Sequence, residues 1–282
     1  MRGYRRGVTI PLRPPTDGPG AAGLGARRAA PRPTRPTGPD PLAPLLDLPG
    51  VRAAADAART AVDRLLGHKV LRRESAGVSS ESALRGARAS ASLEGVDVPL
   101  AQVRTGDVSE PTLQGALRVS VALGSMVDTW DRAPGQVLAR MHVLAAADLV
   151  PSAELGRPAP QSSGRLGGVF GLITGATTAP AVLIAAVVHG ELAAVEPFAV
   201  GSGVVARAAG RLTGIARGLD PKAVSVPEVG FAELGADAYA EALAGYRSGT
   251  AEGVAGWLAH CCRATELGAV EGLAICESLL RG

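Results

Sequence analysis

Aromatic residues are scarce in this sequence. Phe, Trp and Tyr make up 3% of its 282 residues, whereas apolar residues together make up 46%. A chain of this length and apolar content can bury a core, which excludes disorder throughout. Alanine, leucine, valine and arginine dominate instead, and this favours helices built from small side chains over a sheet of aromatic and branched residues. The composition predicts an all-α domain.

Cysteines are equally few. Cys261 and Cys262 are adjacent and Cys276 is the third, so their odd number and spacing exclude an ordinary disulfide framework. The sequence His260-Cys261-Cys262 also lacks the ligand spacing of a zinc site. We expect core thiols in a reducing compartment.

No long hydrophobic run is present. No stretch reaches the roughly 18 to 20 uninterrupted apolar residues that a membrane span needs. Proline and charge follow the paired arginines at the start, where a signal peptide would need an apolar segment. The sequence therefore predicts a cytoplasmic protein without a membrane partner.

Positive charge is concentrated at the N-terminus. Residues 1–40 contain eight arginines and two aspartates, so this tail carries +6 and the rest of the chain −3, given a total of +3. Residues 1–50 also hold eleven of the 21 prolines. We interpret residues 1–47 as a disordered Pro/Arg-rich arm and residues 48–282 as the folded domain. The arm is either an electrostatic tether for nucleic acid or another polyanion, or a solvated tail.

Helical periodicity begins after this arm. The apolar spacing predicts a row of helices. They are expected at 51–66, 83–95, 111–130, 134–150, 180–196, 204–218, 235–249 and 250–280. The helix over 180–196 is apolar nearly all round, so we expect it at the centre of the bundle. A serine-rich link over 74–82 and a glycine-rich loop over 156–179 separate some of these helices.

Residues 195–207, VEPFAVGSGVVAR, combine a Pro-Phe pair, a Gly-Ser-Gly turn and an arginine one helical turn later. The turn formed by Gly201, Ser202 and Gly203 opens a helix, whose free amides and positive dipole end form an anion site in principle. The alternative is that two glycines only permit a sharp reversal between packed helices. Arg207 is either paired with a group near this turn or faces solvent.

This stretch resembles the signature of the Fic (Fido-domain) proteins, H-P-F-x-[DE]-G-N-G-R-x-x-R. Pro197, Phe198, Gly201, Gly203 and Arg207 match it in register. The resemblance spans roughly residues 78–280 and implies a Fic-like helical bundle with a short flap or loop before the central helix.

Further positions match family elements outside the signature. His142 and His189 stand where the two preceding helices often carry a structural histidine, and Tyr246 lies at a landmark of the closing segment, as does Trp257. Residues 90–95, SASLEG, fit the inhibitory helix pattern [ST]-x-x-x-E-[GN]. The resemblance thus implies a regulatory role for Ser90 and Glu94, with Glu94 paired to Arg207 so that it blocks the terminal phosphate of ATP.

Active members of this family transfer AMP from ATP to a protein hydroxyl. The signature histidine acts as base, an acidic residue holds magnesium, the glycine turn cradles the phosphates, and two arginines balance their charge. This chain departs from the signature at four positions: Glu196 replaces the histidine, Val200 the acidic residue, Ser202 the asparagine and Val204 the first arginine.

The departures set the functional expectations. Valine offers no oxygen ligand to a hard cation, so we expect no magnesium and only weak binding of ATP or another adenine nucleotide at Gly201, Ser202, Gly203 and Arg207. The leading interpretation is a catalytically impaired regulatory protein with an unidentified protein partner. The alternative is an active nucleotidyl- or phospho-transferase of altered mechanism with Glu196 as its base. Nucleic-acid binding through the arm and homo-oligomer formation are also compatible with the sequence.

Overall fold

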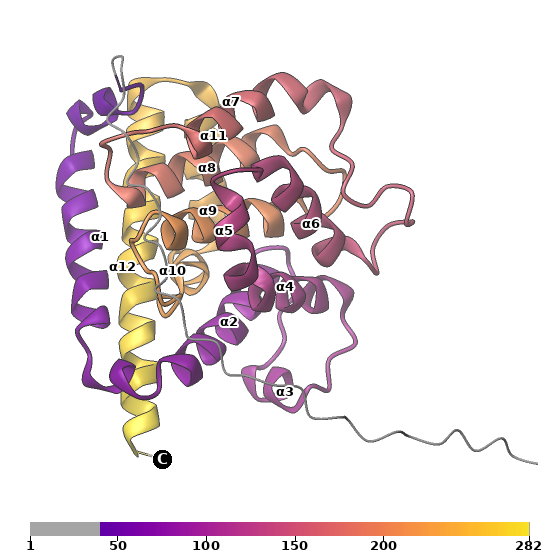
Figure 1. Cartoon of the computed structure of the whole chain (residues 1–282), viewed down its shortest axis with the longest axis vertical. Coiled ribbons are helices and arrows are strands. Elements are labelled where there is room, and N and C mark those ends of the chain that lie inside the picture. Colours follow the sequence, from indigo (N-terminus) through magenta and orange to yellow (C-terminus); the bar gives the residue numbers. More distant parts are fainter. Residues whose placement is uncertain (1–39, 282) are drawn as a thin grey trace, which may run out of the picture. The chain divides into compact units, whose positions relative to one another are not determined.

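The computed structural model describes residues 40–281, and every regular element in this range is a helix. In chain order (Figure 1) they are η1 Ala43–Asp47, α1 Val51–Leu66, η2 Lys69–Arg72, α2 Ser75–Ser92, α3 Leu100–Thr105, α4 Pro111–Ala122, η3 Leu123–Met126, α5 Val127–Trp130, α6 Pro134–Ala146, η4 Pro160–Ser162, α7 Ser163–Thr174, α8 Ala181–Val195, α9 Ser202–Ala216, α10 Pro227–Leu234, α11 Ala236–Ser248 and α12 Ala251–Arg281. The all-α fold predicted from composition is confirmed.

Helix α8 is the buried centre, as its apolar sequence predicts. Most of its residues are buried, and α7, α9, α11 and α12 all contact it. The packing of α8 on α9 is close, because a Cβ at Gly210 of α9 would lie 2.9 Å from Cβ of His189 of α8. From the other side, the indole N–H of Trp257 donates a 2.9 Å hydrogen bond to the carbonyl of Ala186. These contacts fix the position at which α8 ends and the turn to α9 begins.

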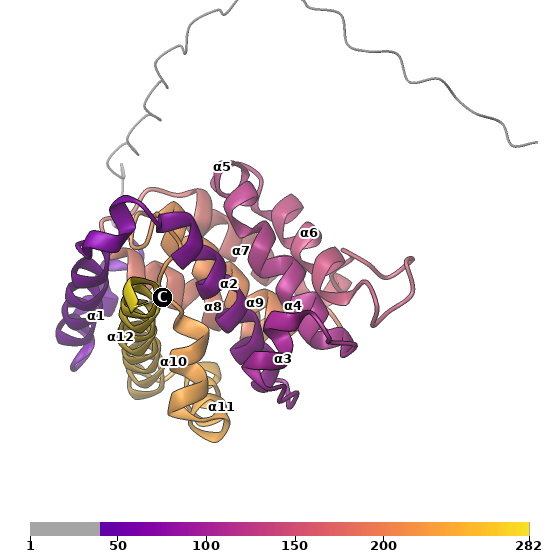
Figure 2. The same ribbon diagram turned by 90° about the horizontal axis from the view of Figure 1, so that it is seen from below.

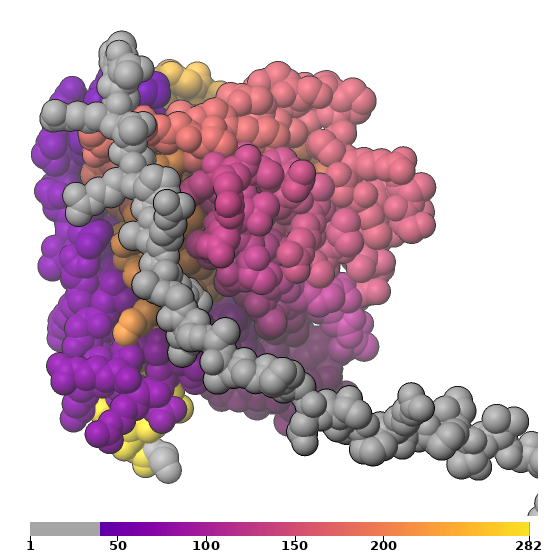
Figure 3. Space-filling view, viewed as in Figure 1, coloured from indigo at the N-terminus to yellow at the C-terminus, as the bar shows by residue number. Residues whose placement is uncertain are grey.

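Helix α12 is the longest element and lines one side of the bundle (Figure 2). It packs along α1, α10 and α11. Glycines permit two of these crossings, since a Cβ at Gly268 would lie 2.5 Å from the carbonyl carbon of Val226, and one at Gly272 would lie 2.6 Å from Leu65. The space-filling view shows α1 along one edge and the residues of α4 to α7 on the other side of the same face (Figure 3).

Several predicted loops are helical. The glycine-rich segment 156–179, predicted as a loop, contains η4 and all of α7, because Leu166, Val169 and Ile173 recur at helical spacing and are buried. The serine-rich link over 74–82 is the first half of α2, and α10 interrupts the connection after Gly218. High glycine and serine content led to the prediction of loops in these segments. Their helices form because packing against the rest of the domain stabilises them.

The start of the fold also differs from the prediction. Leu42 is buried, Ala43–Asp47 form η1, and Asp40 accepts hydrogen bonds from Thr177 and Thr178. These bonds hold the pKa of Asp40 at about 2, although burial opposes the shift. Residues 40–47 therefore pack on the domain, and the predicted boundary at residue 48 falls too late. The rest of the predicted arm lies outside the described residues.

Within residues 40–281, no helix combines the length and the apolar character needed to cross a membrane.

Gly230 tests the close packing of α10 on α12. A Cβ at this position would lie 2.7 Å from the backbone carbonyl carbon of Ala264, which a rotamer change cannot relieve. We expect Gly230→Ala to lower the free energy of unfolding by about 1–3 kcal/mol, because overpacking forces a backbone shift. Urea unfolding followed by circular dichroism measures this.

The matched control is Gly256→Ala in α12, where a Cβ meets no atom within 4 Å. There the higher helix propensity of alanine should stabilise the protein by up to about 1 kcal/mol. If both variants lose the same free energy of unfolding, the close approach of α10 to α12 at Gly230 is contradicted.

Candidate functional site

The turn between α8 and α9 has a fixed, partly strained backbone. Helix α8 ends at Val195, and Glu196 follows in the left-handed conformation with φ 47°, which is uncommon for a residue other than glycine. Gly201 has φ 77° and is the N-cap of α9, with no side chain capping the helix. The first amides of α9 therefore lie at an N-terminus without a side-chain cap, the arrangement that favours an anion.

Ser202, which stands at the family's asparagine position, closes this turn from inside. Its hydroxyl accepts a 2.9 Å hydrogen bond from the amide of Phe198 and donates a 2.7 Å hydrogen bond to the carbonyl of the same residue. The serine hydroxyl is thus used within the protein both as donor and as acceptor. We conclude that Ser202 stabilises the loop geometry with its side chain.

His142 of α6 supports the turn from behind. Its ring stacks on Phe198 at a centroid distance of 3.9 Å. Nδ1 accepts a 2.9 Å hydrogen bond from the amide of Gly156, so Nε2 carries the proton that it donates to the carbonyl of Val200 at 3.2 Å. Burial lowers the pKa of His142, and the bond to Val200 partly offsets this. The neutral imidazole therefore joins the segment after α6 to the turn.

A cavity of about 300 Å³ opens in front of the turn. The end of α8, the turn, the first residues of α9, helix α11 and the residues after α2 all contribute to it. Its lining is Leu93, Glu94, Ala193, Glu196, Phe198, Ala199, Gly201, Ser202, Gly203, Arg207, Tyr239 and Leu243. The structure thus brings Glu94, Glu196, the Gly-Ser-Gly turn and Arg207 to one site.

Arg207 is 3% exposed, so the solvent-facing interpretation is wrong. Its guanidinium donates from Nε to the hydroxyl of Ser90 at 2.9 Å, and from Nη2 to the carbonyl of Ser90 at 2.9 Å and to Glu94 at 2.6 Å. The ring of Tyr239 lies 5.9 Å from the guanidinium carbon. Ser90 and Glu94, at the end of α2, therefore hold Arg207 in place.

Glu94 covers the backbone of the glycine turn. A Cβ at Gly203 would lie 3.0 Å from the carboxyl carbon of Glu94 and 3.3 Å from Nη1 of Arg207. The carboxylate thus occupies the space directly over the first turn of α9. There it is stabilised both by the ion pair and by the positive end of the helix dipole. In this conformation a carboxylate of the protein lies against the first turn of α9.

Two valines flank the turn where the family signature carries charge. Val200 is 39% exposed beside the turn, whereas Val204 is buried in the first part of α9. Neither side chain can ligate a cation or pair with a phosphate. In the described part of the chain, no group of three or more His, Cys, Asp or Glu residues is arranged to hold a metal ion.

Glu196 lies at the mouth of the cavity. Its carboxylate forms an ion pair with Arg247 of α11, and both side chains are exposed. The same arginine donates a 2.8 Å hydrogen bond to the carbonyl of Ala193, which caps the end of α8. Arg247 therefore binds the residue at the family's histidine position.

Tyr239 and Arg247 are site residues that the sequence analysis missed. The hydroxyl of Tyr239 lies 2.8 Å from Nε2 of His189. Burial raises the pKa of Tyr239 and lowers that of His189 well below its usual value, so the tyrosine donates this bond to a neutral imidazole. The only available signal was that one predicted helix, 235–249, contains two of the three tyrosines and an arginine.

Comparison with known proteins identifies the fold. No family model matches the sequence, and no curated protein matches it either. Among solved structures, a Fic family protein from Desulfovibrio desulfuricans G20 matches with a TM-score of 0.66 at 18% identity, over 80% of this chain and 74% of that one. Fic-1 (residues 134–508) from C. elegans matches with a TM-score of 0.64 at 16% identity, over 81% and 73%.

A single-residue variant of the same Fic-1 fragment matches with a TM-score of 0.59 at 19% identity, over 82% of this chain and 74% of that one. At this level of identity the likeness concerns the fold. The chain has the all-helical fold of the Fic proteins.

The buried ion pair at the site predicts an asymmetric response to mutation. Arg207→Ala should lower the free energy of unfolding by about 3–5 kcal/mol, because it removes a buried cation and leaves its acceptors at Ser90 and Glu94 without a donor. Glu94→Ala should lower the free energy of unfolding by only about 1–2 kcal/mol, because the glutamate side chain is 32% exposed and water reaches it. If urea unfolding shows the same loss of free energy for both variants, this asymmetry is contradicted. As a control, Arg247→Ala should change stability by about 1 kcal/mol or less, because its ion pair is exposed.

His142 predicts a pH dependence of stability. Because its pKa is lowered in the folded state, the unfolded chain binds the proton more readily, and stability should fall as pH drops below about 6.5. His142→Gln keeps an acceptor for Gly156 and a donor for Val200 but does not titrate. The variant should therefore show a shallower loss of melting temperature between about pH 7.5 and about pH 5.5. An unchanged slope would show that His142 does not contribute.

Proposed function

We propose that this chain is a Fido-domain protein whose nucleotide turn has lost metal-dependent AMP transfer and serves as a regulatory binding site. The observation that carries the proposal is the carboxylate of Glu94 over Gly203, held there by Arg207. The fold and the free amides of α9 favour a phosphate-bearing ligand. The two valines disfavour a metal-bound triphosphate.

The charge around the turn argues for a ligand with little negative charge. Among the described residues, Arg207 is the one arginine that lines the cavity, and it is already paired with Glu94. The loss of an arginine contact to a phosphate costs roughly 1.5–3 kcal/mol, which is about ten- to a hundredfold in affinity. AMP should therefore bind at least as well as ATP, without magnesium, and weakly as long as Glu94 covers the turn.

Binding to the intact protein is the direct test. We expect calorimetry on the full chain to give weak, magnesium-independent binding of AMP, and Glu94→Ala to strengthen it about tenfold or more, because the α9 amides become accessible. Glu252→Ala, an exposed glutamate at the start of α12, is the matched control and should leave the affinity unchanged. Magnesium-dependent binding of ATP by the unmodified protein would contradict the proposal.

A transferase of altered mechanism is the second candidate, because Glu196 lines the same cavity as the glycine turn. In this case the Glu196 carboxylate would take the proton of an incoming hydroxyl. Its carboxylate is already paired with Arg247, so the incoming hydroxyl would have to displace this ion pair. Labelling of protein by radioactive ATP that is lost in Glu196→Gln would support this candidate over the first.

Cytoplasmic location, a protein partner, nucleic-acid binding by the arm and self-association stay predictions. The arm is the testable part: if it binds nucleic acid, affinity should fall steeply with salt and vanish when residues 1–39 are deleted.

A further inference from the structure

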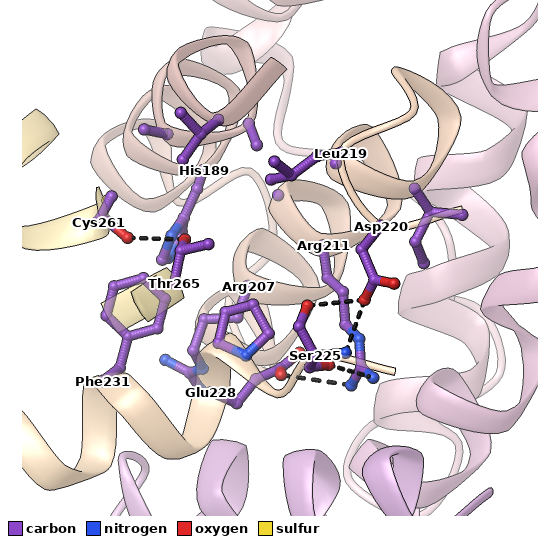
Figure 4. A pocket seen from close by; sticks show the side chains of 17 residues that line it. His189, Arg207, Arg211, Leu219, Asp220, Ser225, Glu228, Phe231, Cys261 and Thr265 are labelled. Carbon is purple, nitrogen blue, oxygen red and sulfur yellow. Dashed lines mark hydrogen bonds and ion pairs between the residues drawn. The ribbon is translucent and has the colours of Figure 1, made fainter. Parts of the chain in front are cut away.

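A second cavity lies between α8, α9, α10 and α12, and shares Arg207 with the cavity in front of the glycine turn. Figure 4 shows that side chains from all four helices and from the segment after α9 line it. Its volume is about 50 Å³. Its lining includes the apolar residues Val182, Ile215, Leu219 and Phe231 and the polar residues Arg211, Asp220, Ser225 and Glu228.

The polar residues carry two buried atoms without a hydrogen-bond partner in the described part of the protein. They are Nε of Arg211, a donor, and Oδ1 of Asp220, an acceptor. A buried polar atom without a partner destabilises the folded state, so each of these two atoms calls for a partner. The two atoms do not bond each other, but both residues face the same cavity. A ligand in the cavity must therefore be able to donate and to accept.

The remaining bonds show that the rest of this network is already occupied. Arg211 donates from Nη1 to Glu228 at 3.3 Å and from Nη2 to the carbonyl of Ser225 at 3.0 Å. Oδ2 of Asp220 accepts 2.7 Å bonds from both the amide and the hydroxyl of Ser225. Of the described side-chain nitrogen and oxygen atoms of Arg211 and Asp220, Nε and Oδ1 are thus the ones without any hydrogen-bond partner.

The wall carries charges of both signs, which favours a neutral ligand. Arg211, and Arg207 with its partner Glu94 outside the wall, are positive, whereas Asp220 and Glu228 are negative. His189, which also lines the cavity, is neutral because burial, above all, lowers its pKa well below the usual value. An anion would meet the two carboxylates and a cation the two guanidinium groups. Neither is stabilised in so small a space.

We propose that this cavity is a binding site for ordered water, in which one molecule bridges Nε of Arg211 and Oδ1 of Asp220. Water is neutral and both donates and accepts, so it satisfies both atoms at once. A water molecule needs at least about 10–15 Å³, so the cavity has room for about three. Because the unpartnered atoms belong to Arg211 and Asp220, we place the bridging water beside these two residues.

The water also has a structural consequence. Arg211 also lines a second pocket, together with Ser79, Ser120 and Ala223. It also holds Ala223, whose φ of 52° is unusual for a residue other than glycine, through a 3.3 Å bond to its carbonyl. The bound water thus completes the network that holds the segment between α9 and α10.

A high-resolution crystal structure of the full chain tests the proposal directly. We expect density for a water oxygen about 2.7–3.2 Å from both Nε of Arg211 and Oδ1 of Asp220. A dry cavity, or one that has closed so that the two side chains bond each other, would overturn the proposal.

A solution measurement provides a second, independent test. Oxygen-17 magnetic relaxation dispersion counts water molecules that stay bound longer than the protein tumbles. Arg211→Met should remove at least one such molecule. Arg217→Met is the matched control, because Arg217 follows α9 directly but bonds the carbonyls at the end of α7 and does not line the cavity. The same count in wild type and Arg211→Met would overturn the proposal. If Arg211→Met does not fold, the crystal structure alone decides.

Discussion

The ion pair between Arg207 and Glu94 is the interaction on which the site depends. It joins the end of α2 to the first turns of α9, over a sequence separation that no local pattern specifies. The pair is stable because Arg207 is buried and also bonds both oxygens of Ser90. Since the same carboxylate lies over Gly203, the contact that holds the two helices together also lies beside the turn that we propose as an anion site.

The backbone of the turn between α8 and α9 is held by contacts within the protein. Three sets of contacts within the protein maintain this geometry. Ser202 forms two hydrogen bonds with the backbone of Phe198, and the ring of His142 stacks on that of Phe198. The amide of Ala159 also donates a hydrogen bond to the carbonyl of Pro197. A fold of this kind can therefore preserve a phosphate-sized turn for packing reasons. This explains how Val200 and Val204 can flank the turn without disturbing it.

The sequence predicted the fold class and the central helix because apolar periodicity is a local property. It failed over 156–179, where glycine content suggested a loop but Leu166, Val169 and Ile173 bury one face of α7 against the bundle. The pairing of Glu94 with Arg207 was predicted only from the family resemblance. Tyr239 and Arg247 were missed because their partners, His189 and Glu196, lie elsewhere along the chain, and such contacts follow from tertiary packing alone.

The amide signal of Gly203 in a nitrogen–proton NMR spectrum tests the central claim most directly. If Glu94 covers the turn, titration with AMP should shift this signal little in the unmodified protein and strongly in Glu94→Ala. Equal shifts in both proteins would contradict the claim that the Arg207–Glu94 pair closes the anion site.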